Sequence, residues 1–520
     1  MRIAELIKIL RPKVKYRGLP PHQNLWCGGL PDFEAGGISC NSKEVGENFI
    51  FVAIKGNRQD GNKFIEEAVA RGARVIVHSP RSLVHSPQSI VHSPQSPPLN
   101  HWRAGTVHSK KACFVAVKDT RKALAQLAAS FYGNPSAKIK VVGITGTNGK
   151  TTITYLLEAI LKQAGLQPAV IGTINYRFAD KVTPSKNTTP GPVELQGLLC
   201  AMLKAGAQYA LMEVSSHALH QQRTEGINFS SAIFTNLTQD HLDYHRTLEN
   251  YFKSKLGLFK GLGRGAFAVL NNDDPYSAKI RKATQARLVT YAIGNKADVT
   301  ARDIKFTSSQ TEFTLSLGAD KIKLKAPLIG EHNVYNILAC AAWGLKEGLA
   351  PALIKSALEK FSSVPGRLEK IEAKGDFCVF VDYAHTEDAL KNVISALKKI
   401  SGRKIIVVFG CGGERDKGKR PKMGRAACGL ADYAVITSDN PRSEDPLSII
   451  ADIKKGIKKN NYCVIPQRKE AIEKAISLAQ AGDIVLVAGK GHENYQILKD
   501  RQIPFDDREA VRECLRSLNY

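Results

Sequence analysis

The sequence contains no apolar run close to the ~20 residues that cross a membrane, and its ten cysteines form no C-x-x-C pair. The missing pairs argue against a disulfide framework and against a zinc site. Residues 1–17 also lack the apolar core and small-residue cleavage site of a secretory signal. We therefore expect a cytoplasmic protein that does not insert into a membrane.

The chain also has fewer acidic than basic residues, which gives it a formal net charge of +26. It nevertheless lacks runs of basic residues interleaved with aromatic ones. Lysines recur instead in helix-surface patterns, as in residues 391–399 and 454–459. A protein that binds a polyanion should gather its positive charge on one face. Dispersed charge favours solvated surfaces and attraction of small anionic substrates, so we expect no nucleic-acid partner.

The length of 520 residues is too great for one hydrophobic core and suggests about three domains of ~150 residues. We predict an N-terminal domain over residues 1–117, a central domain over 118–363 and a C-terminal domain over 364–520. A seven-residue repeat that begins Val-His-Ser-Pro starts at residues 77, 84 and 91. Its Ser, Pro and Gln content cannot bury a core, which predicts a flexible surface insertion over about 78–110.

Residues 141–152 carry a phosphate-loop signature, with Gly143, Gly149, Lys150 and Thr151 close to the spacing of that motif. An apolar run precedes the glycines and a helical pattern follows, which is the strand-loop-helix context that the motif needs. Backbone N–H groups would surround the phosphates, Lys150 would add charge, and the Thr151 hydroxyl would reach Mg²⁺. The predicted loop contacts to ATP are Gly146, Thr147, Asn148, Gly149, Lys150, Thr151 and Thr152.

The rest of the chain alternates apolar strand-like runs with amphipathic helices, which predicts an α/β fold with mainly parallel sheets covered on both faces. Glu213 ends one such run, and Asp240 and His241 follow the next, where they are candidate Mg²⁺ ligands; a structural role for the histidine stays open. Four further clusters of glycine and charged residues follow strand-like runs near residues 382, 409, 437 and 488. Parallel sheets place their sites at such strand ends.

Together, Thr145–Thr152, the Glu213 and Asp240-His241 segments, Tyr251–Lys255 and the four C-terminal clusters resemble the Mur ligase family over nearly the whole chain. The resemblance implies a three-domain architecture with a central P-loop ATPase-type parallel sheet and a C-terminal Rossmann-like domain. It also implies an ATP- and Mg²⁺-dependent ligase of peptidoglycan synthesis, and so of cell-wall biogenesis, that works through an acyl phosphate. Within the family, the likeness is greatest to members that join meso-diaminopimelate to UDP-N-acetylmuramoyl-L-alanyl-D-glutamate. We expect a monomer.

The resemblance also implies roles for individual residues. Lys150, Glu213, His241 and Lys255 would be catalytic, and Mg²⁺ would be held by Thr151, Glu213, His241 and Lys255, the last as a carbamate. The base and ribose of ATP would lie against Asn333, Asn336, Arg367 and Asp382. The UDP-linked substrate would meet Ser42, Asn187, Thr188, Thr189, Ser215, Gln221 and Arg223. The incoming amino acid would meet Arg415, Asp439, Asn440, Pro441, Arg442, Gly489 and Glu493.

The sequence departs from the family pattern at three places, one of them Glu387 in place of a common proline, and four alternatives stay open. Asn41 and Lys43 stand beside Ser42 where the family often has Asp and Arg, which removes a carboxylate and a guanidinium fork from the uridine contacts. His332 replaces a more usual aromatic residue. Within the same fold, the acceptor could be L-lysine or the acceptor of another Mur ligase, or the protein could be a folylpolyglutamate synthase. In a different class, the net positive charge leaves a nucleic-acid-dependent P-loop ATPase as a distant alternative. Arg442 favours meso-diaminopimelate, because its guanidinium can pair with the second carboxylate that lysine lacks.

Overall fold

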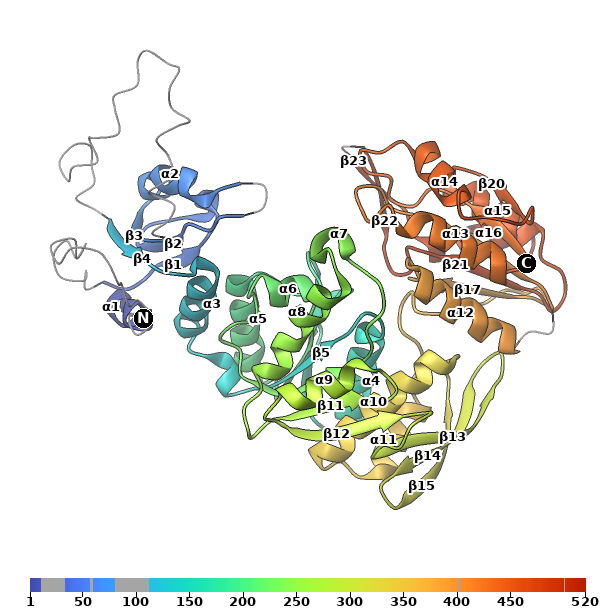
Figure 1. Cartoon of the computed structure of the whole chain (residues 1–520), viewed down its shortest axis with the longest axis horizontal. Coiled ribbons are helices and arrows are strands. Elements are labelled where there is room, and N and C mark those ends of the chain that lie inside the picture. Colours follow the sequence, from blue (N-terminus) through green and yellow to red (C-terminus); the bar gives the residue numbers. More distant parts are fainter. Residues whose placement is uncertain (11–32, 57–58, 80–111, 401–402, 500) are drawn as a thin grey trace, which may run out of the picture. The chain divides into compact units, whose positions relative to one another are not determined.

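The computed structural model of the chain describes residues 1–10, 33–56, 59–79, 112–400, 403–499 and 501–520 (Figure 1). Its internal contacts divide it into two compact units. The first comprises Met1–Lys140, Thr189–Ala207 and His217–Asn228, and the second comprises Val141–Thr188, Gln208–Ser216 and Phe229–Tyr520. The predicted repeat insertion lies almost entirely outside the described residues. Among the described helices, none is both long enough and apolar enough to cross a membrane.

The first unit is built on a four-stranded parallel sheet in the order β1-β2-β3-β4. Its strands are β1 (Gly37–Ser39), β2 (Phe49–Val52), β3 (Ala73–His78) and β4 (Cys113–Ala116), and its helices include α1 (Ile3–Lys8), α2 (Ile65–Ala70), α3 (Thr120–Phe131) and α5 (Pro192–Lys204). Because side chains alternate across a strand, Ile50 and Val75 join a core with α1 and α3, whereas Phe51 and Ile76 join a second core with Ala68 of α2. Both faces of the sheet are therefore covered.

The second unit contains an eleven-stranded sheet in the order β15-β14-β13-β12-β11-β10-β5-β9-β6-β7-β8. These strands are β5 (Lys140–Thr145), β6 (Pro168–Ile171), β7 (Asn175–Phe178), β8 (Lys181–Pro184), β9 (Tyr209–Glu213), β10 (Phe229–Phe234), β11 (Phe267–Asn271), β12 (Arg287–Ala292), β13 (Val299–Phe306), β14 (Thr311–Leu317) and β15 (Asp320–Ala326). The pairs from β5 through β10 to β13 are parallel, and so is the β6-β9 pair. The outer hairpins are antiparallel, so the expected parallel sheet forms only the middle of a mixed one.

The helices that alternate with these strands along the chain include those that hold the phosphate loop in place. They are α4 (Lys150–Gln163), α6 (Ser216–His220), α7 (Leu242–His245), α8 (Leu248–Lys260), α9 (Tyr276–Ala283), α10 (Glu331–Glu347) and α11 (Pro351–Glu359), although most of α6 falls in the first unit. Ile153, Leu157 and Leu161 of α4 share a core with Val142 of β5 and Ile337 of α10. The loop between β5 and α4 is therefore anchored at both ends by buried side chains.

A six-stranded sheet in the order β16-β17-β21-β18-β19-β20 carries the remainder of the second unit. Its strands are β16 (Glu369–Ile371), β17 (Cys378–Asp382), β18 (Ile405–Phe409), β19 (Tyr433–Ile436), β20 (Tyr462–Val464) and β21 (Ile484–Ala488), followed by the hairpin β22 (Tyr495–Leu498) and β23 (Arg501–Pro504). Its helices are α12 (Glu387–Ile400), α13 (Lys419–Leu430), α14 (Pro446–Lys454), α15 (Arg468–Ser477) and α16 (Asp507–Ser517). Alternate residues of β18 and β21 enter two cores, one on each face, which explains their continuous apolar runs.

The four predicted glycine- and charge-rich clusters follow β17, β18, β19 and β21, which are neighbours in this sheet and run parallel. The carboxyl ends of neighbouring parallel strands lie at one edge. The α/β fold class predicted from the sequence is confirmed. The predicted boundaries at residues 117 and 363 remain predictions, since the contacts divide the chain differently.

Candidate active site

The phosphate loop joins β5 to α4 and requires glycine at two positions. Gly146 has φ +151°, and a Cβ there would lie 1.8 Å from Thr235 Oγ1. Gly149 has φ +89°, and its Cβ would lie 2.4 Å from Asn336 Oδ1. Only glycine fits backbone that approaches its neighbours so closely in a left-handed conformation. The loop is further tied to the chain after β10, because the amide of Asn148 donates to the side chain of Asn236 at 3.0 Å.

A half-buried lysine, Lys150, and a buried one, Lys255, converge on this loop. Lys150 donates to the carbonyl oxygens of Gly146 and Thr147 at 3.0 and 2.9 Å. Lys255, in α8, is 1% exposed and donates to the same Gly146 carbonyl at 2.7 Å. Burial, and then the charge of Lys150, hold the pKa of Lys255 well below its usual value. The lowered pKa favours the neutral amine more than in a solvated lysine, and a neutral amine is a nucleophile.

Glu213, at the end of β9, is 1% exposed and links the loop to the segment after β6. Its Oε2 accepts from the hydroxyls of Thr151 at 3.0 Å and Thr173 at 2.9 Å, and its Oε1 accepts from the Thr173 amide at 2.9 Å. A carboxylate beside the phosphate-loop threonine provides the hard oxygen ligands that Mg²⁺ prefers. Thr173 was missed in the sequence, where nothing marks its position.

Asp240 and His241 lie side by side, with His241 Nε2 3.3 Å from Asp240 Oδ2. The backbone of His241 is left-handed, at φ +54°, and its amide donates to Asp240 Oδ1 at 2.8 Å. Burial alone would raise the pKa of Asp240, but the charges of His241, His385 and Lys419 lower it. Among the described residues, no three His, Cys, Asp or Glu side chains gather as a ready metal cluster. The predicted roles of His241 and of the Lys255 carbamate in metal binding remain predictions.

The four residues predicted to meet the base and ribose of ATP lie in two groups. Asn336 donates to Asn333 Oδ1 at 3.0 Å, and its own Oδ1 lies against Gly149 of the phosphate loop. Arg367 donates to the Thr151 hydroxyl at 3.1 Å. Asp382 accepts the amides of Leu368 and Ala384 at 2.6 and 2.7 Å, and burial raises the pKa of its carboxyl. Asn333 and Asn336 therefore adjoin the phosphate loop. Asp382 adjoins the segment that carries Arg367, and Arg367 itself contacts the loop through Thr151.

The residues predicted to meet the UDP-linked substrate fall in both units. In the first unit, Arg223 donates to the Thr189 carbonyl at 2.8 Å and to Gln221 Oε1 at 2.8 Å, and the Ser42 hydroxyl donates to Glu67 at 2.8 Å. Asn41, the family departure, caps the short 3₁₀ turn Ser42–Glu44 and donates to Glu44. In the second unit, Thr188 Oγ1 lies 3.1 Å from Thr173 Oγ1, and the carbonyl of Asn187 accepts from Tyr176. Ser215 lies just after β9.

The predicted amino-acid residues gather after β19 and β21. Glu493 Oε2 accepts from Asn440 Nδ2 at 2.9 Å and from Lys490 Nζ at 3.2 Å, and Lys490 also lies 3.8 Å from Asp439. Gly489 has φ +124°, and a Cβ there would lie 3.0 Å from Asp439 Oδ2. Burial, and then the charge of Asp439, raise the pKa of Glu493. The fully buried Lys490 was not predicted as a site residue, although a lysine between two glycines directly after a buried strand is a usable signal.

Two arginine side chains border this cluster, the exposed Arg415 on the loop after β18 and the half-buried Arg442 on the loop after β19. Arg442 Nη1 donates to the carbonyls of Gly413 and Asn440 at 2.8 and 3.3 Å, and Arg415 donates to the carbonyl of Glu414 at 3.3 Å. A Cβ on Gly412 would lie 3.0 Å from Arg442 Nη1 and 3.8 Å from Arg415 Cγ. Burial, and then the charge of Arg415, lower the pKa of Arg442. Two like charges so placed form a natural site for a carboxylate.

Three domain descriptions match the chain: "Mur ligase family, catalytic domain" over residues 34–132, "Mur ligase middle domain" over 144–344, and "Mur ligase, glutamate ligase domain" over 366–491. Two similar proteins are both named UDP-N-acetylmuramoyl-L-alanyl-D-glutamate--2,6-diaminopimelate ligase. The one from Clostridium tetani is 41% identical over 100% of both chains. The one from Clostridium acetobutylicum, which carries the number 1 after that name, is 44% identical over 95% of this chain and 97% of its own.

Solved structures agree. A structure with the same ligase name is 32% identical, covers 95% of this chain and 97% of its own, and has a TM-score of 0.66. A MurF ligase from Thermotoga maritima, in complex with ADP, is 22% identical with a TM-score of 0.61 and supports the fold alone.

The fold and the phosphate-loop site thus define an ATP-dependent ligase. The chain belongs to the Mur ligase family, as the full-length identity to the clostridial proteins shows.

Proposed function

We propose that the protein joins meso-diaminopimelate to the γ-carboxylate of UDP-N-acetylmuramoyl-L-alanyl-D-glutamate, with ATP as the phosphoryl donor and an acyl phosphate as intermediate. The observation that carries the proposal is the pairing of Arg415 and Arg442 beside Asp439, Asn440 and Glu493. Two guanidiniums suit a carboxylate, and the neighbouring carboxylates suit an ammonium group. The relatives' names provide the substrate pair.

Mg²⁺ fits the residues present, because the Thr151 hydroxyl and the Glu213 carboxylate lie 3.0 Å apart as hard oxygen ligands. Thr151, Glu213, His241 and a carbamate on Lys255 would hold the metal, which when bound offsets the negative charge on the transferred phosphoryl group. An unprotonated Lys255 amine can add to the carbon of CO₂ and release one proton, which gives a carbamate whose single negative charge is shared by two oxygens. Burial of Lys255 supports this modification, because it lowers the pKa of the amine and so favours the unprotonated form.

The chain's own residues supply the remaining chemistry. Lys150 and the amides of the loop would neutralise the phosphates at the start of α4, where the helix dipole also favours anions. Asn333, Asn336, Arg367 and Asp382 would orient the nucleoside. Arg442 and Glu493 would hold the incoming amino acid so that its amine meets the activated carboxylate away from water. Such a reaction belongs in the cytoplasm, and we propose that the protein acts there as a monomer without a nucleic-acid partner.

L-lysine is the second candidate acceptor, because Glu493 and Asp439 would bind its distal ammonium equally well. It lacks the second carboxylate, so it would leave the guanidinium pair unmatched, which disfavours it. An assay of phosphate release with UDP-N-acetylmuramoyl-L-alanyl-D-glutamate and a panel of amino acids tests the proposal. We expect release only when the nucleotide substrate and meso-diaminopimelate are both present. Release stimulated by DNA or RNA instead would refute it.

A further inference from the structure

We propose that Arg420 and Glu444 are positioning residues that hold the two arginine-bearing loops together and thereby set the affinity for the incoming amino acid. The two loops are the segment 410–418, which carries Arg415, and the segment 437–445, which carries Arg442. We refer to the Arg420–Glu444 pair as the loop clamp. The inference rests on the proposed function, since it assigns the clamp to the same amino-acid site.

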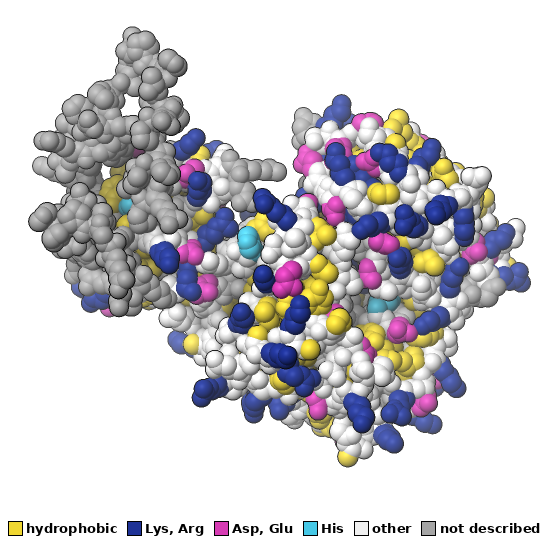
Figure 2. All heavy atoms as spheres, in the orientation of Figure 1, with side chains coloured by type: hydrophobic (Ala, Val, Ile, Leu, Met, Phe, Trp, Pro, Cys, Tyr) yellow, Lys and Arg dark blue, Asp and Glu magenta, His cyan; other side chains and the backbone are white. Residues whose placement is uncertain are grey.

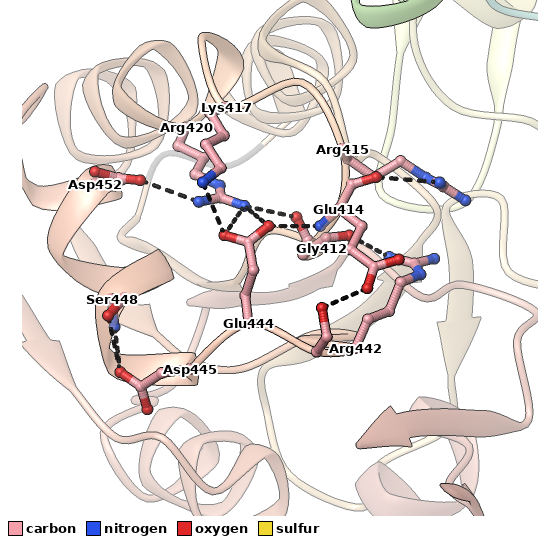
Figure 3. Close-up of polar contacts among 12 residues, drawn as sticks. Gly412, Glu414, Arg415, Lys417, Arg420, Arg442, Glu444, Asp445, Ser448 and Asp452 are labelled. Atoms are coloured by element: carbon pink, nitrogen blue, oxygen red, sulfur yellow. Dashed lines mark hydrogen bonds and ion pairs between the residues drawn. The ribbon is translucent and has the colours of Figure 1, made fainter. Parts of the chain in front are cut away.

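Arg420 lies in the first turn of α13 and is 1% exposed, so its charge must be matched inside the protein (Figure 3). Its Nη2 lies 3.0 and 2.9 Å from the two carboxylate oxygens of Glu444, which belongs to the second loop. The same Nη2 donates to the carbonyl of Gly412, in the first loop, at 3.4 Å. One buried nitrogen therefore contacts both loops.

Glu444, in the second loop, also binds the first loop directly. Its Oε1 accepts the backbone amide of Glu414 at 2.6 Å, immediately before Arg415 in the chain (Figure 3). That hydrogen bond, more than any other contact, holds the pKa of Glu444 below its usual value, and Arg420 lowers it further. Ser443 adds a parallel link by donating its hydroxyl to the Glu414 side chain. The carboxylate thus stays charged while it spans the two loops.

The loops need such support because their backbones are strained and tightly apposed. Glu414 and Arg442 both adopt left-handed backbone, at φ +53° and +54°, which is unfavourable for residues with a side chain. A Cβ on Gly413 would lie 1.9 Å from the carbonyl oxygen of Pro441, so the loops touch backbone to backbone. Without the clamp, the relaxed loops would separate the two guanidiniums that are to share one carboxylate.

The same arginine offers a matched control. Arg420 Nη1 donates to Asp452 of α14 at 3.0 Å, on the side of the guanidinium that faces away from both loops (Figure 3). Asp452→Ala removes one counter-ion of a buried charge, as Glu444→Ala does, but leaves the loop contacts in place. Both variants should lower the melting temperature, whereas only Glu444→Ala should affect the amino-acid site.

The test measures steady-state constants and amide exchange in the full-length protein. We expect Glu444→Ala to raise KM for meso-diaminopimelate at least ten-fold while KM for ATP stays within three-fold, and Asp452→Ala to leave both within three-fold. Amide hydrogen exchange in segment 410–416 should speed up at least ten-fold in Glu444→Ala and remain unchanged in Asp452→Ala. If Glu444→Ala does not fold, Glu444→Gln, which can still accept the Glu414 amide, replaces it and should show a smaller change in the same direction.

Equal effects of the two substitutions on KM for meso-diaminopimelate would overturn the clamp, because they would reduce it to general stability. Unchanged exchange in Glu444→Ala would overturn it as well, whichever amino acid the protein uses. A wild type that makes no product with meso-diaminopimelate would instead refute the proposed function, while the exchange comparison would still decide whether the clamp exists.

Discussion

Lys255 shows how burial changes the chemistry of a single side chain. Its amine lies 2.7 Å from the Gly146 carbonyl and close to the charge of Lys150, and its pKa is well below that of a solvated lysine. The sequence pointed to Lys255 only through its resemblance to a family motif. A lysine in an amphipathic helix is usually solvated, and only the packing of α8 against the loop lowers the pKa of this one.

If Lys255 holds Mg²⁺ as a carbamate, Lys255→Ala should lower turnover by at least roughly 10²-fold. A short carboxylic acid should partly restore turnover, since it can replace the missing carbamate oxygens. Lys253→Ala is the matched control: it removes an exposed lysine from the same helix and should have no effect. Full activity of Lys255→Ala, measured by phosphate release, would contradict the assignment.

His332, in the first turn of α10, should make stability depend on pH. Burial lowers its pKa to about 4, well below that of the unfolded chain. Between pH 6.5 and about 4 the unfolded state therefore binds the extra proton, so stability is lost as the pH falls through this range. Each such histidine contributes a slope of up to about 1.4 kcal/mol per pH unit.

His332→Phe should therefore flatten the pH dependence of the free energy of unfolding below pH 6.5, as measured by denaturant titration. His385 and His492, whose pKa values burial also lowers to about 4 and about 3, should maintain the remaining slope. The exposed His220 provides the control, and His220→Gln should leave the slope unchanged. An identical slope in His332→Phe and wild type would show that His332 does not titrate in this range.

At the scale of elements, sequence patterns identified several strands and helices but not their neighbours. The apolar runs at β5, β9, β17, β18, β19 and β21 were all predicted, because short apolar runs suit buried strands. The antiparallel pairs of β7-β8 and β13-β14-β15 were not, because even the clear alternation of β14 does not specify the direction of a neighbouring strand. Arg420 and Lys490 were likewise missed, because a buried charge is recognised only from the partners that surround it.

The repeat insertion joins β3 to β4, two neighbouring strands that pair in parallel. A parallel connection must return along the length of a strand, so a tight turn cannot replace it and a linker of roughly a dozen residues is needed. We expect a Gly/Ser linker of about 15 residues in place of residues 80–110 to leave turnover and melting temperature nearly unchanged. A large loss of either, in a variant that keeps the measured secondary structure, would show that the insertion packs or binds.

At the scale of the whole molecule, the charge of +26 is spread rather than gathered. On the face shown in Figure 2, Lys and Arg side chains lie across the surface with Asp and Glu among them. The number of domains could be estimated from the length of the chain. Which segments form each of the two compact units could not. Helix α3 belongs to the first unit because Leu124 and Leu127 share a core with β2 and β3. Periodicity shows that a helix has an apolar face, but not which sheet covers it.

The choice of amino acid tests the account most directly. Removing one partner of a buried charge pair typically costs about 2 to 5 kcal/mol, and a bound amino acid would bury the half-buried Arg442, so wild type should prefer meso-diaminopimelate to L-lysine by at least roughly 10³-fold in kcat/KM. Arg442→Ala should lose most of that preference while KM for ATP stays within a few-fold. The measurement is the ratio of kcat/KM for the two amino acids in both proteins. A wild type that uses L-lysine as well as meso-diaminopimelate, or a variant in which ATP and amino acid weaken equally, would contradict the account.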